Sequence, residues 1–357
     1  MTCIPKITRS LLAAATLAIS AHLDAAEPAS DALQRAYAAA QAGDYPGAVA
    51  LLKTEAGKGS PDAANALGQL FQAGQGVKAS ATEALRWYQQ AADASFPPAM
   101  LNLGMLLTKG ADGVPADPDK ARFLIQAAAE EGFAPAQVAC GRMAEAGGQD
   151  HGDPAEARAW YEKAAAQANP DGLMAMARFY DAGIGGSRDL VKGFDACRRA
   201  AESGSLVAMN EVAVRYQKGL GVGADPIAAI GWFVVAAQRG QPAARVNLGN
   251  CYEVGKGVMQ DLELALSYYS AAAKQNFGPA QLLLAQLFEQ GKGTKADPVQ
   301  AYVNYTYAAA NGMEGASRKA DEIKAKLSPV QLKDAAGLVA EANKGAGPAS
   351  PEPAARK

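Results

Sequence analysis

The chain has 357 residues, of which 20% are charged, and its formal net charge at pH 7 is −2. This balance lacks the excess of lysine and arginine that binding to the phosphates of a nucleic acid requires, so the composition argues against a nucleic-acid-binding protein. Runs in which Val, Ile and Thr alternate with polar residues are also rare. The chain is therefore predicted to be all-α, without strands.

The first 26 residues have the pattern of a secretory signal peptide. Lys6 and Arg9 precede an apolar run over residues 11–19, and small residues follow it. This run is too short to anchor a mature protein in a bilayer, and no later segment approaches that length, so no membrane span is expected in the mature chain. The alternative, a retained amphipathic helix, is disfavoured because the run has no polar face. We expect export to the periplasm or the exterior of a bacterium, with cleavage between about residues 21 and 27.

Residues 27–62 are predicted to form a helix pair that caps the N-terminal end of the fold. Two helical stretches, residues 32–37 and 45–53, are joined by Gly43 and Asp44. A terminal unit of a repeat protein is expected to be atypical, because one of its faces meets water instead of a neighbouring unit.

A repeated unit occupies residues 63–315. Its period is 36 residues with a single 37, and the seven copies begin at Ala63, Ala99, Ala136, Gly172, Ala208, Ala244 and Ala280. A fixed period in this range is typical of a solenoid, in which each unit is too small to bury its own apolar face and stacks on its neighbours. We therefore predict an α-solenoid of stacked antiparallel helix pairs.

The first half of each unit is predicted to be a helix, here called helix A. With the unit start counted as zero, columns four and eight are mostly apolar and column five is Gly or Ala, as in Leu248, Gly249 and Tyr252. The apolar columns mark the buried stripe, and the small column lets a second helix come close. A Gly-x-Gly turn such as 255–257 ends the helix. No strand precedes these glycines, so neither a nucleotide nor any other cofactor is expected to bind there.

The second helix of each unit, helix B, begins at a predicted capping residue. Pro follows four of the caps, and Glu83, Glu156 and Gln300 are placed to complete capping boxes. An aromatic pair such as Trp232 and Phe233 is predicted to form a wedge between repeats, since each buried ring removes a large area from water. The seven caps are Ser80, Asp117, Asp153, Asp189, Asp225, Asp261 and Asp297.

Residues 316–344 are predicted to form C-terminal capping helices. A capping box from Ser328 to Gln331 starts the second of them. Residues 345–357 contain three prolines among small residues and are expected to be disordered.

With these columns in place, the units resemble Sel-one-like repeats, which are relatives of the tetratricopeptide repeat. The shared pattern runs Ala-x3-Leu-Gly-x2-Tyr-x2-Gly-x-Gly-Val, then Asp, Lys-Ala, Trp-Tyr and Ala-Ala, and it is seen most cleanly from Ala244 to Ala273. The resemblance implies a right-handed superhelix and membership of a family made up largely of adaptors and scaffolds. Repeats three and four depart most from the pattern, with Ala144 in column eight and Ala196-Cys197 in place of the aromatic pair.

The cysteines and the histidine of the mature chain give weak signals for chemistry. Cys140, Cys197 and Cys251 stand in or beside packing columns, where buried apolar thiols are expected, although a bridge between the first two is a second possibility. His151 stands between Asp150 and Asp153 in a loop, but the sequence places no further ligand there, so no metal site is expected.

We predict a non-enzymatic scaffold or adaptor that binds a protein, a peptide or a cell-envelope polymer through the concave face of the solenoid. The alternative is a cell-wall-active enzyme of the β-lactamase or hydrolase type, for which His151 and its flanking carboxylates are the nearest candidates. Relatives with β-lactam-binding activity carry a Cys pair in every repeat, and this sequence does not. No catalytic residue is therefore predicted.

The resemblance suggests that helix A lines the concave side and that its columns two, six and nine face a ligand. An apolar floor beside alternating charge suits an extended peptide. A second interpretation is that Arg142 with Glu145, and Arg178 with Asp181, are only solubilising pairs three residues apart on one helix. The predicted binding residues are Leu101, Met105, Val138, Arg142, Glu145, Met174, Arg178 and Asp181.

Overall fold

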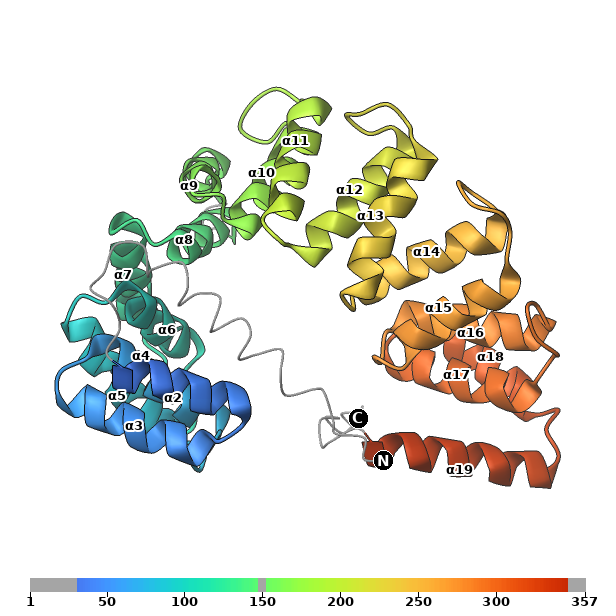
Figure 1. Ribbon diagram of the computed structural model, residues 1–357, viewed down its shortest axis with the longest axis horizontal. Helices are drawn as coiled ribbons and strands as arrows, with labels where there is room; N and C mark the ends of the chain where they lie inside the picture. Colours follow the sequence, from blue (N-terminus) through green and yellow to red (C-terminus); the bar gives the residue numbers. More distant parts are fainter. Residues whose placement is uncertain (1–30, 147–151, 346–357) are drawn as a thin grey trace. The chain divides into compact units, whose positions relative to one another are not determined.

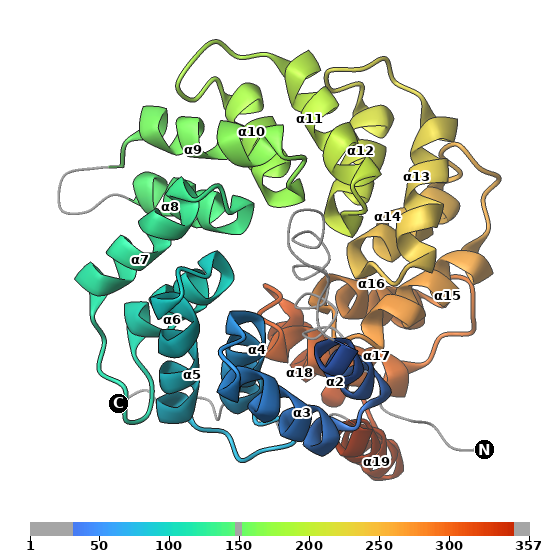
Figure 2. The ribbon, with the colours of Figure 1, turned by 60° about the vertical axis from the view of Figure 1, so that its left-hand side comes forward.

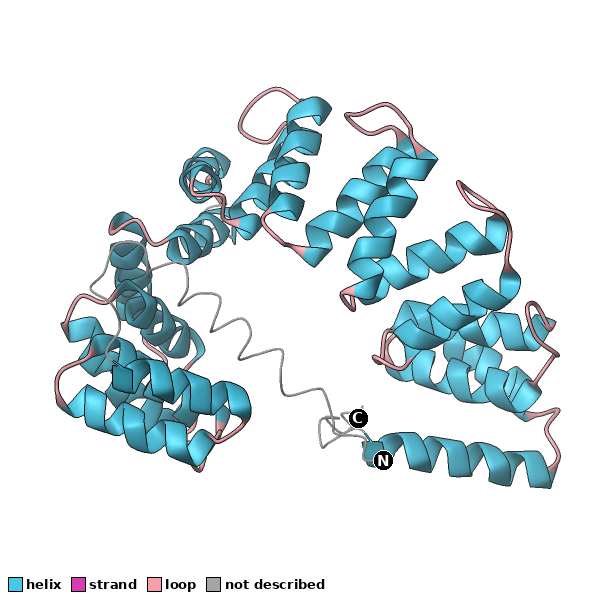
Figure 3. Ribbon diagram, in the orientation of Figure 1, coloured by secondary structure: helices cyan, strands magenta, loops and turns pink. Residues whose placement is uncertain are grey.

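The computed structural model describes residues 31–146 and 152–345. Over these residues the chain forms eighteen helices and one isolated bridge, between Ala111 and Val114, which confirms the predicted all-α class (Figures 1 and 3). The predicted signal peptide and the tail beyond residue 345 lie outside the described residues. The helices are α2 (Asp31–Ala42), α3 (Tyr45–Gly57), α4 (Pro61–Ala73), α5 (Ala81–Asp93), α6 (Pro97–Lys109), α7 (Pro118–Glu130), α8 (Ala134–Ala146), α9 (Pro154–Ala166), α10 (Pro170–Ala182), α11 (Leu190–Glu202), α12 (Leu206–Lys218), α13 (Pro226–Gln238), α14 (Pro242–Val254), α15 (Leu262–Ala273), α16 (Gly278–Gln290), α17 (Pro298–Ala310), α18 (Ala316–Lys324) and α19 (Pro329–Gly345).

The chain divides into two compact units at Met176, within α10. In unit 1, helices α4, α6 and α8 are the A helices of successive repeats, and each contacts the next directly, while the B helices α5 and α7 lie outside them (Figure 2). Unit 2 repeats the arrangement, with α14 against α16 and the B helices α13 and α15 outside. The predicted stack of helix pairs is thus confirmed within each unit.

All seven predicted caps of helix B are confirmed. In every repeat the cap side chain accepts a backbone N–H from the first turn of its own helix, as Asp261 does from Leu264 at 2.9 Å. The cap's own N–H donates to the column-eight carbonyl of helix A in the same repeat, at 2.8–2.9 Å in all seven. Each cap residue therefore joins the two helices of its repeat as well as starting one of them.

This second bond corrects the predicted capping boxes of helix B. In a capping box the N3 side chain takes the N–H of the cap residue, but here that N–H is already bonded to helix A. The Glu156 carboxylate accepts from the Trp160 indole at 3.3 Å instead. A complete capping box forms at the start of α19, where the N–H of the cap residue is not bonded to a helix A carbonyl. There Ser328 donates its N–H to the Gln331 side chain at 2.9 Å, and Gln331 donates its N–H to the Ser328 hydroxyl at 3.3 Å.

The small residues of column five let helix B pack against helix A, as predicted. A Cβ on Gly249 would lie 2.7 Å from the Tyr269 ring, and one on Gly68 would overlap the Tyr88 ring. The second glycine of the Gly-x-Gly turn has a different role. A Cβ on Gly257, whose φ is +78°, would lie 2.8 Å from the carbonyl oxygen of Pro226, the first residue of helix B in the preceding repeat. These glycines serve contacts between repeats.

Burial within the aromatic pair is uneven. The second member is almost completely buried in five repeats, whereas the first is half-buried in several, Trp232 among them. The wedge between repeats is therefore mainly the second ring. Its members are Tyr88, Tyr161, Phe233, Tyr269 and Tyr305, each at most 1% exposed.

Candidate functional site

The predicted binding residues lie on A helices of both units. Leu101 and Met105 are in α6, Val138, Arg142 and Glu145 are in α8, and Met174 is in the part of α10 that belongs to unit 1. Arg178 and Asp181 are in the part of α10 that belongs to unit 2.

The apolar members in unit 1 differ in their exposure. The Met105 side chain is open to solvent, with 59% of the residue exposed. Leu101 is half-buried and packs on a hydrophobic core that is shared by repeats one, two and three. Val138 is only 4% exposed, so its predicted place on an accessible face is wrong. Column two therefore holds half-buried and buried residues, with Leu101 half-buried and Val138 buried.

The charged members in unit 1 form contacts beyond their own helix. The Arg142 guanidinium lies 3.6 Å from the Asp171 carboxylate in α10, and both side chains are about 70% exposed (68% and 71%). An ion pair so open to water contributes little to stability, so Arg142 remains available to a ligand. Glu145 instead accepts a 2.6 Å hydrogen bond from the Tyr161 hydroxyl, which ties helix A to helix B within the third repeat.

The Glu145 contact belongs to a series. In four repeats the second aromatic residue of helix B is Tyr, and its hydroxyl donates to the column-nine side chain of helix A. Burial, and then the hydrogen bond to Glu253, raise the pKa of Tyr269 above its ordinary value, so this hydroxyl stays protonated as a donor. In these four repeats the column-nine side chain therefore joins helix A to helix B and serves the fold. The pairs are Tyr88 with Gln72 (2.8 Å), Tyr161 with Glu145 (2.6 Å), Tyr269 with Glu253 (2.9 Å) and Tyr305 with Glu289 (2.6 Å).

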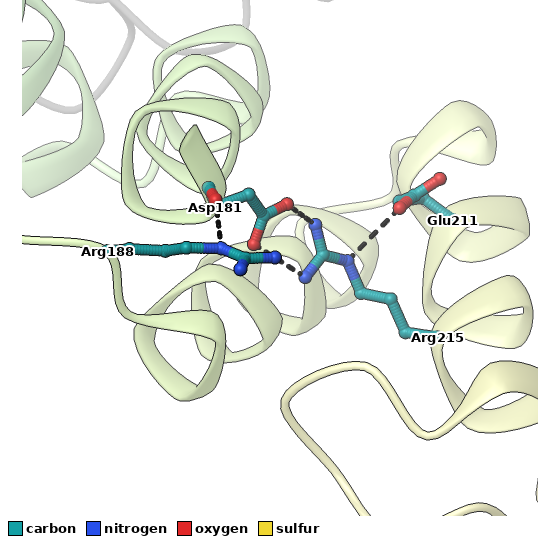
Figure 4. Close-up of polar contacts among 4 residues, drawn as sticks. All are labelled: Asp181, Arg188, Glu211 and Arg215. Carbon is teal, nitrogen blue, oxygen red and sulfur yellow. Dashed lines mark hydrogen bonds and ion pairs between the residues drawn. The ribbon is translucent and has the colours of Figure 1, made fainter. Parts of the chain in front are cut away.

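Asp181 occupies column nine of repeat four, where helix B offers no tyrosine, and its partner comes from the next repeat (Figure 4). The Arg215 guanidinium donates to both carboxylate oxygens of Asp181, with Nη1 3.1 Å from Oδ1. Its Nε also donates to Glu211 at 3.1 Å. The Arg188 Nε donates to the backbone carbonyl of Asp181 at 2.9 Å. We call Asp181, Arg188, Glu211 and Arg215 the repeat-four ion cluster.

The surroundings of the repeat-four ion cluster are adapted to it. Arg215 is only 4% exposed and stands in column seven, which is apolar in the other repeats. Gly193 fills the small column of helix B without a Cβ, and the space that a Cβ would take is occupied by Asp181 Oδ1. Cys197 stands where other repeats have the tyrosine and is fully buried.

The charges of the cluster stabilise one another. Burial alone would lower the pKa of Arg215, but the hydrogen bond to Asp181 and the nearby carboxylates raise it above its ordinary value, so the guanidinium stays charged. Burial raises the pKa of Cys197 to about 12, although Arg215 opposes this rise. A buried, protonated thiol is not a nucleophile. The cluster can therefore hold two repeats together, but it has no group prepared to attack a substrate.

The other candidate residues are placed as follows. Cys140, Cys197 and Cys251 are free thiols and all three are buried, so the interpretation as packing residues is confirmed. Asp153 caps α9, whereas His151 and Asp150 lie outside the described residues. Over residues 31–146 and 152–345 no three His, Cys, Asp or Glu side chains are grouped so as to hold a metal ion. In the same part of the chain, no helix has the length and apolar character needed to cross a bilayer.

These features define a helical-repeat protein in which Glu145 and Asp181, two of the predicted binding residues, instead bond neighbouring helices of the fold. A model of the Sel1 repeat matches residues 61–96, 97–133, 134–169, 170–205, 206–241, 242–277 and 278–313. The chain therefore belongs to the Sel1 repeat family, a family of protein-interaction scaffolds, and has seven repeats. Each matched repeat begins two residues before the unit start that we count from the sequence.

Solved structures with the same fold support this assignment. A protective antigen of uropathogenic Escherichia coli with an SLR fold is 29% identical, with a TM-score of 0.66 over 84% of this chain and 64% of the antigen. A Sel1 repeat protein from Oxalobacter formigenes is 28% identical, with a TM-score of 0.63 over 89% of this chain and 92% of its own. The chain thus spans about two thirds of the antigen's length. Among curated proteins, none matches this sequence.

Proposed function

We propose that this protein is an exported, non-enzymatic scaffold that binds a protein partner through the exposed surface of its A helices. The observation that carries the proposal is the exposure of Met105 and Arg142 on neighbouring A helices. Both stand in column six, in the A helices α6 and α8, which contact each other directly. The Met105 residue is 59% exposed, and the Arg142 side chain is 68% exposed. Equivalent columns on touching helices lie side by side.

The chemistry of this pair favours an extended peptide segment. A methionine side chain adapts to apolar groups of different shape, and a guanidinium binds a carboxylate through two parallel hydrogen bonds. In an extended peptide, neighbouring side chains point in opposite directions, so an apolar side chain can contact Met105 while an acidic one binds Arg142. Family membership supports a protein as the partner, and the sequence of residues 1–26 supports export.

Partner capture tests the binding proposal. The full chain is crosslinked in the cell envelope, the captured partner is identified, and its affinity is measured for the wild type and for Arg142→Glu. We expect binding to weaken at least tenfold without loss of helical signal. Arg122→Glu is the matched control, because it makes the same charge change on the exposed side of α7. Equal affinities for the wild type and Arg142→Glu would move the site away from this surface.

Two further measurements test export and the absence of catalysis. The N-terminus of the native protein should lie between about residues 21 and 27. Recovery of Met1 or Thr2 as the first residue would remove the assignment to an exported protein. Purified protein should not hydrolyse nitrocefin, and turnover that disappears in His151→Ala would replace the scaffold by an enzyme.

A further inference from the structure

Unit 1 has a cleft on its B-helix side that the proposed function does not use. The cleft has a volume of about 660 Å³ and lies between α5 and the loop that leads into α7. Side chains along one face of α5, from Thr82 to Asp93, form one wall. Val114 and Pro115 of the loop and Lys120 of α7 form the other. The A-helix pair of Met105 and Arg142 is not part of this lining.

The cleft coincides with the one repeat that is a residue longer than the others. The matched repeat 97–133 has 37 residues, and its extra residue changes the turn after helix A. Gly74, Gly219, Gly255 and Gly291 end their helices in the left-handed conformation, with ψ between 33° and 40°, whereas Gly110 combines a φ of 68° with a ψ of 179°. The loop then closes on itself, with Ala111 and Val114 exchanging hydrogen bonds of 2.9 and 2.8 Å. The insertion therefore reshapes one wall of the cleft.

The floor of the cleft is apolar. Leu85 and Leu107 contribute from α5 and α6, and Val114 and Pro115 contribute from the loop. Leu107 and Val114 are held in place as members of the core that repeats one, two and three share. A fixed apolar floor between polar walls is the arrangement that seats a single apolar side chain of a ligand.

The acidic side chains at the cleft already have partners within the protein. Asp117 caps α7 by accepting the N–H of Lys120 at 3.0 Å. Asp93 accepts a 2.7 Å hydrogen bond from the Gln89 amide. Both carboxylates thus stabilise unit 1 itself.

The cationic side chains are less fully compensated. The Lys120 ammonium donates to the Gln89 carbonyl oxygen, a neutral acceptor, at 3.1 Å. The Arg86 side chain is 65% exposed, stacks over the Trp87 ring at 4.7 Å, and has its nearest carboxylate, Glu83, 3.9 Å away. One turn beyond Lys120, the Phe123 ring is 70% exposed and adds apolar surface on the same side of α7. The cleft thus offers an apolar floor beside two cations, of which Lys120 is bonded to a neutral acceptor and Arg86 forms one exposed ion pair at 3.9 Å.

We infer that this cleft is a second docking site, for an extended acidic segment of a partner protein. An aliphatic or aromatic side chain of that segment enters the apolar floor, and a neighbouring carboxylate binds Lys120 and Arg86. The charged contacts fix the register of the segment, and the apolar side chain supplies most of the buried area. Because the site uses B helices, a partner here leaves the A-helix surface free.

Selection from a displayed library of random dodecapeptides on the immobilised full chain tests the inference. We expect the enriched peptides to share an apolar residue next to Asp or Glu. The most enriched peptide is then synthesised with a fluorescent label, and its affinity is measured by anisotropy. Lys120→Glu should weaken its binding at least tenfold, Lys120→Arg should retain it, and Leu85→Ala should weaken it without removing its salt dependence.

Arg122→Glu is the matched control, since it makes the same change of charge two residues along α7 and is not part of the cleft lining. It should leave the affinity within twofold of the wild type. The inference is overturned if no peptide is enriched, if the enriched peptides lack acidic residues, or if Lys120→Glu binds as well as Arg122→Glu. A peptide that is lost in Arg142→Glu and kept in Lys120→Glu would bind the A-helix surface, which would sink this inference and leave the proposed function intact.

Discussion

Removing Asp181 should destabilise unit 2 more than removing Arg215, even though the two side chains form one ion pair. Asp181→Ala leaves the Arg215 charge 4% exposed with only Glu211 to compensate it. Loss of one partner of a buried ion pair costs about 3–5 kcal/mol. The Asp181 side chain is 28% exposed and Glu211 remains, so we expect about 2–3 kcal/mol.

Arg215→Leu has a different consequence, because it restores the apolar residue that other repeats have in column seven. It leaves Asp181 without its partner but partly in contact with water, so we expect a loss of about 1 kcal/mol or less. The double variant removes both charges and should lie within about 1 kcal/mol of the wild type. The interaction energy from the double-mutant cycle should therefore be at least about 1 kcal/mol.

The assay is urea unfolding followed by the fluorescence of Trp232, which lies in the same repeat as Arg215. Trp87 and Trp160 are replaced by Phe in every variant, so that the signal reports on this repeat alone. Asp171→Ala, which removes the exposed pair with Arg142, is the control and should change the free energy of unfolding by less than about 0.5 kcal/mol. Equal losses for Asp181→Ala and Arg215→Leu, or a double variant as unstable as the sum of the two, would refute the reasoning.

Three further predictions concern stability. Phe233→Ala should lower the free energy of unfolding by about 3–5 kcal/mol because the ring is fully buried, whereas Trp232→Ala should lower it by about half as much because Trp232 is half-buried. Urea midpoints that rank the two variants the other way would contradict the assignment of the wedge to the second ring. Ala168→Gly should stabilise the fold by about 0.5–1 kcal/mol, since Ala168 has a φ of +56°, a conformation that glycine adopts without strain. Ala166→Gly, at the exposed end of α9, is the control and should destabilise the fold by a similar amount. Thermal unfolding of both variants measures the two changes. Burial raises the pKa of Cys140 to about 11, against about 8.5 in an unfolded chain. Above pH 8.5 the unfolded chain loses the thiol proton while the folded state keeps it, so the free energy of unfolding should fall by up to about 1.4 kcal/mol per pH unit. Urea titrations at several pH values should give a smaller slope for Cys140→Ala, and equal slopes would show that the folded protein does not protect the thiol.

The regular part of the fold could be predicted because short sequence patterns within each repeat determine where its helices begin and end. The caps of helix B, the small column and the Gly-x-Gly turn are local patterns, and within the described residues they form where the sequence places them, except for the turn of the longer second repeat. The capping boxes could not be judged locally. Glu156 has the right spacing from Asp153, but the N–H that it would bind is taken by the column-eight carbonyl of helix A, as in every repeat. Only the packing of the two helices reveals that competition.

The candidate site was less predictable for the same physical reason. Helical spacing correctly puts Met105 on an exposed stripe, but the same spacing predicts that Val138 is accessible, and Val138 is only 4% exposed. The bond between Asp181 and Arg215 joins residues 34 positions apart, so pairing within one helix turn could not suggest it. A charged residue in an apolar column, together with a missing tyrosine and a glycine in the small column, was the available signal in the sequence.

The contact between each Gly-x-Gly turn and the preceding repeat bears on how the chain is completed during synthesis. Gly257 rests on the start of α13, and Gly293 in the same way on the start of α15. A repeat that has just left the ribosome therefore still lacks the loop that packs on the start of its second helix, because that loop is encoded by the repeat that follows. Translation that stops at a repeat boundary leaves the newest repeat unfinished, however complete its own sequence is. At the natural end of the array, α18 and α19 pack on α17 and bring the series to a close.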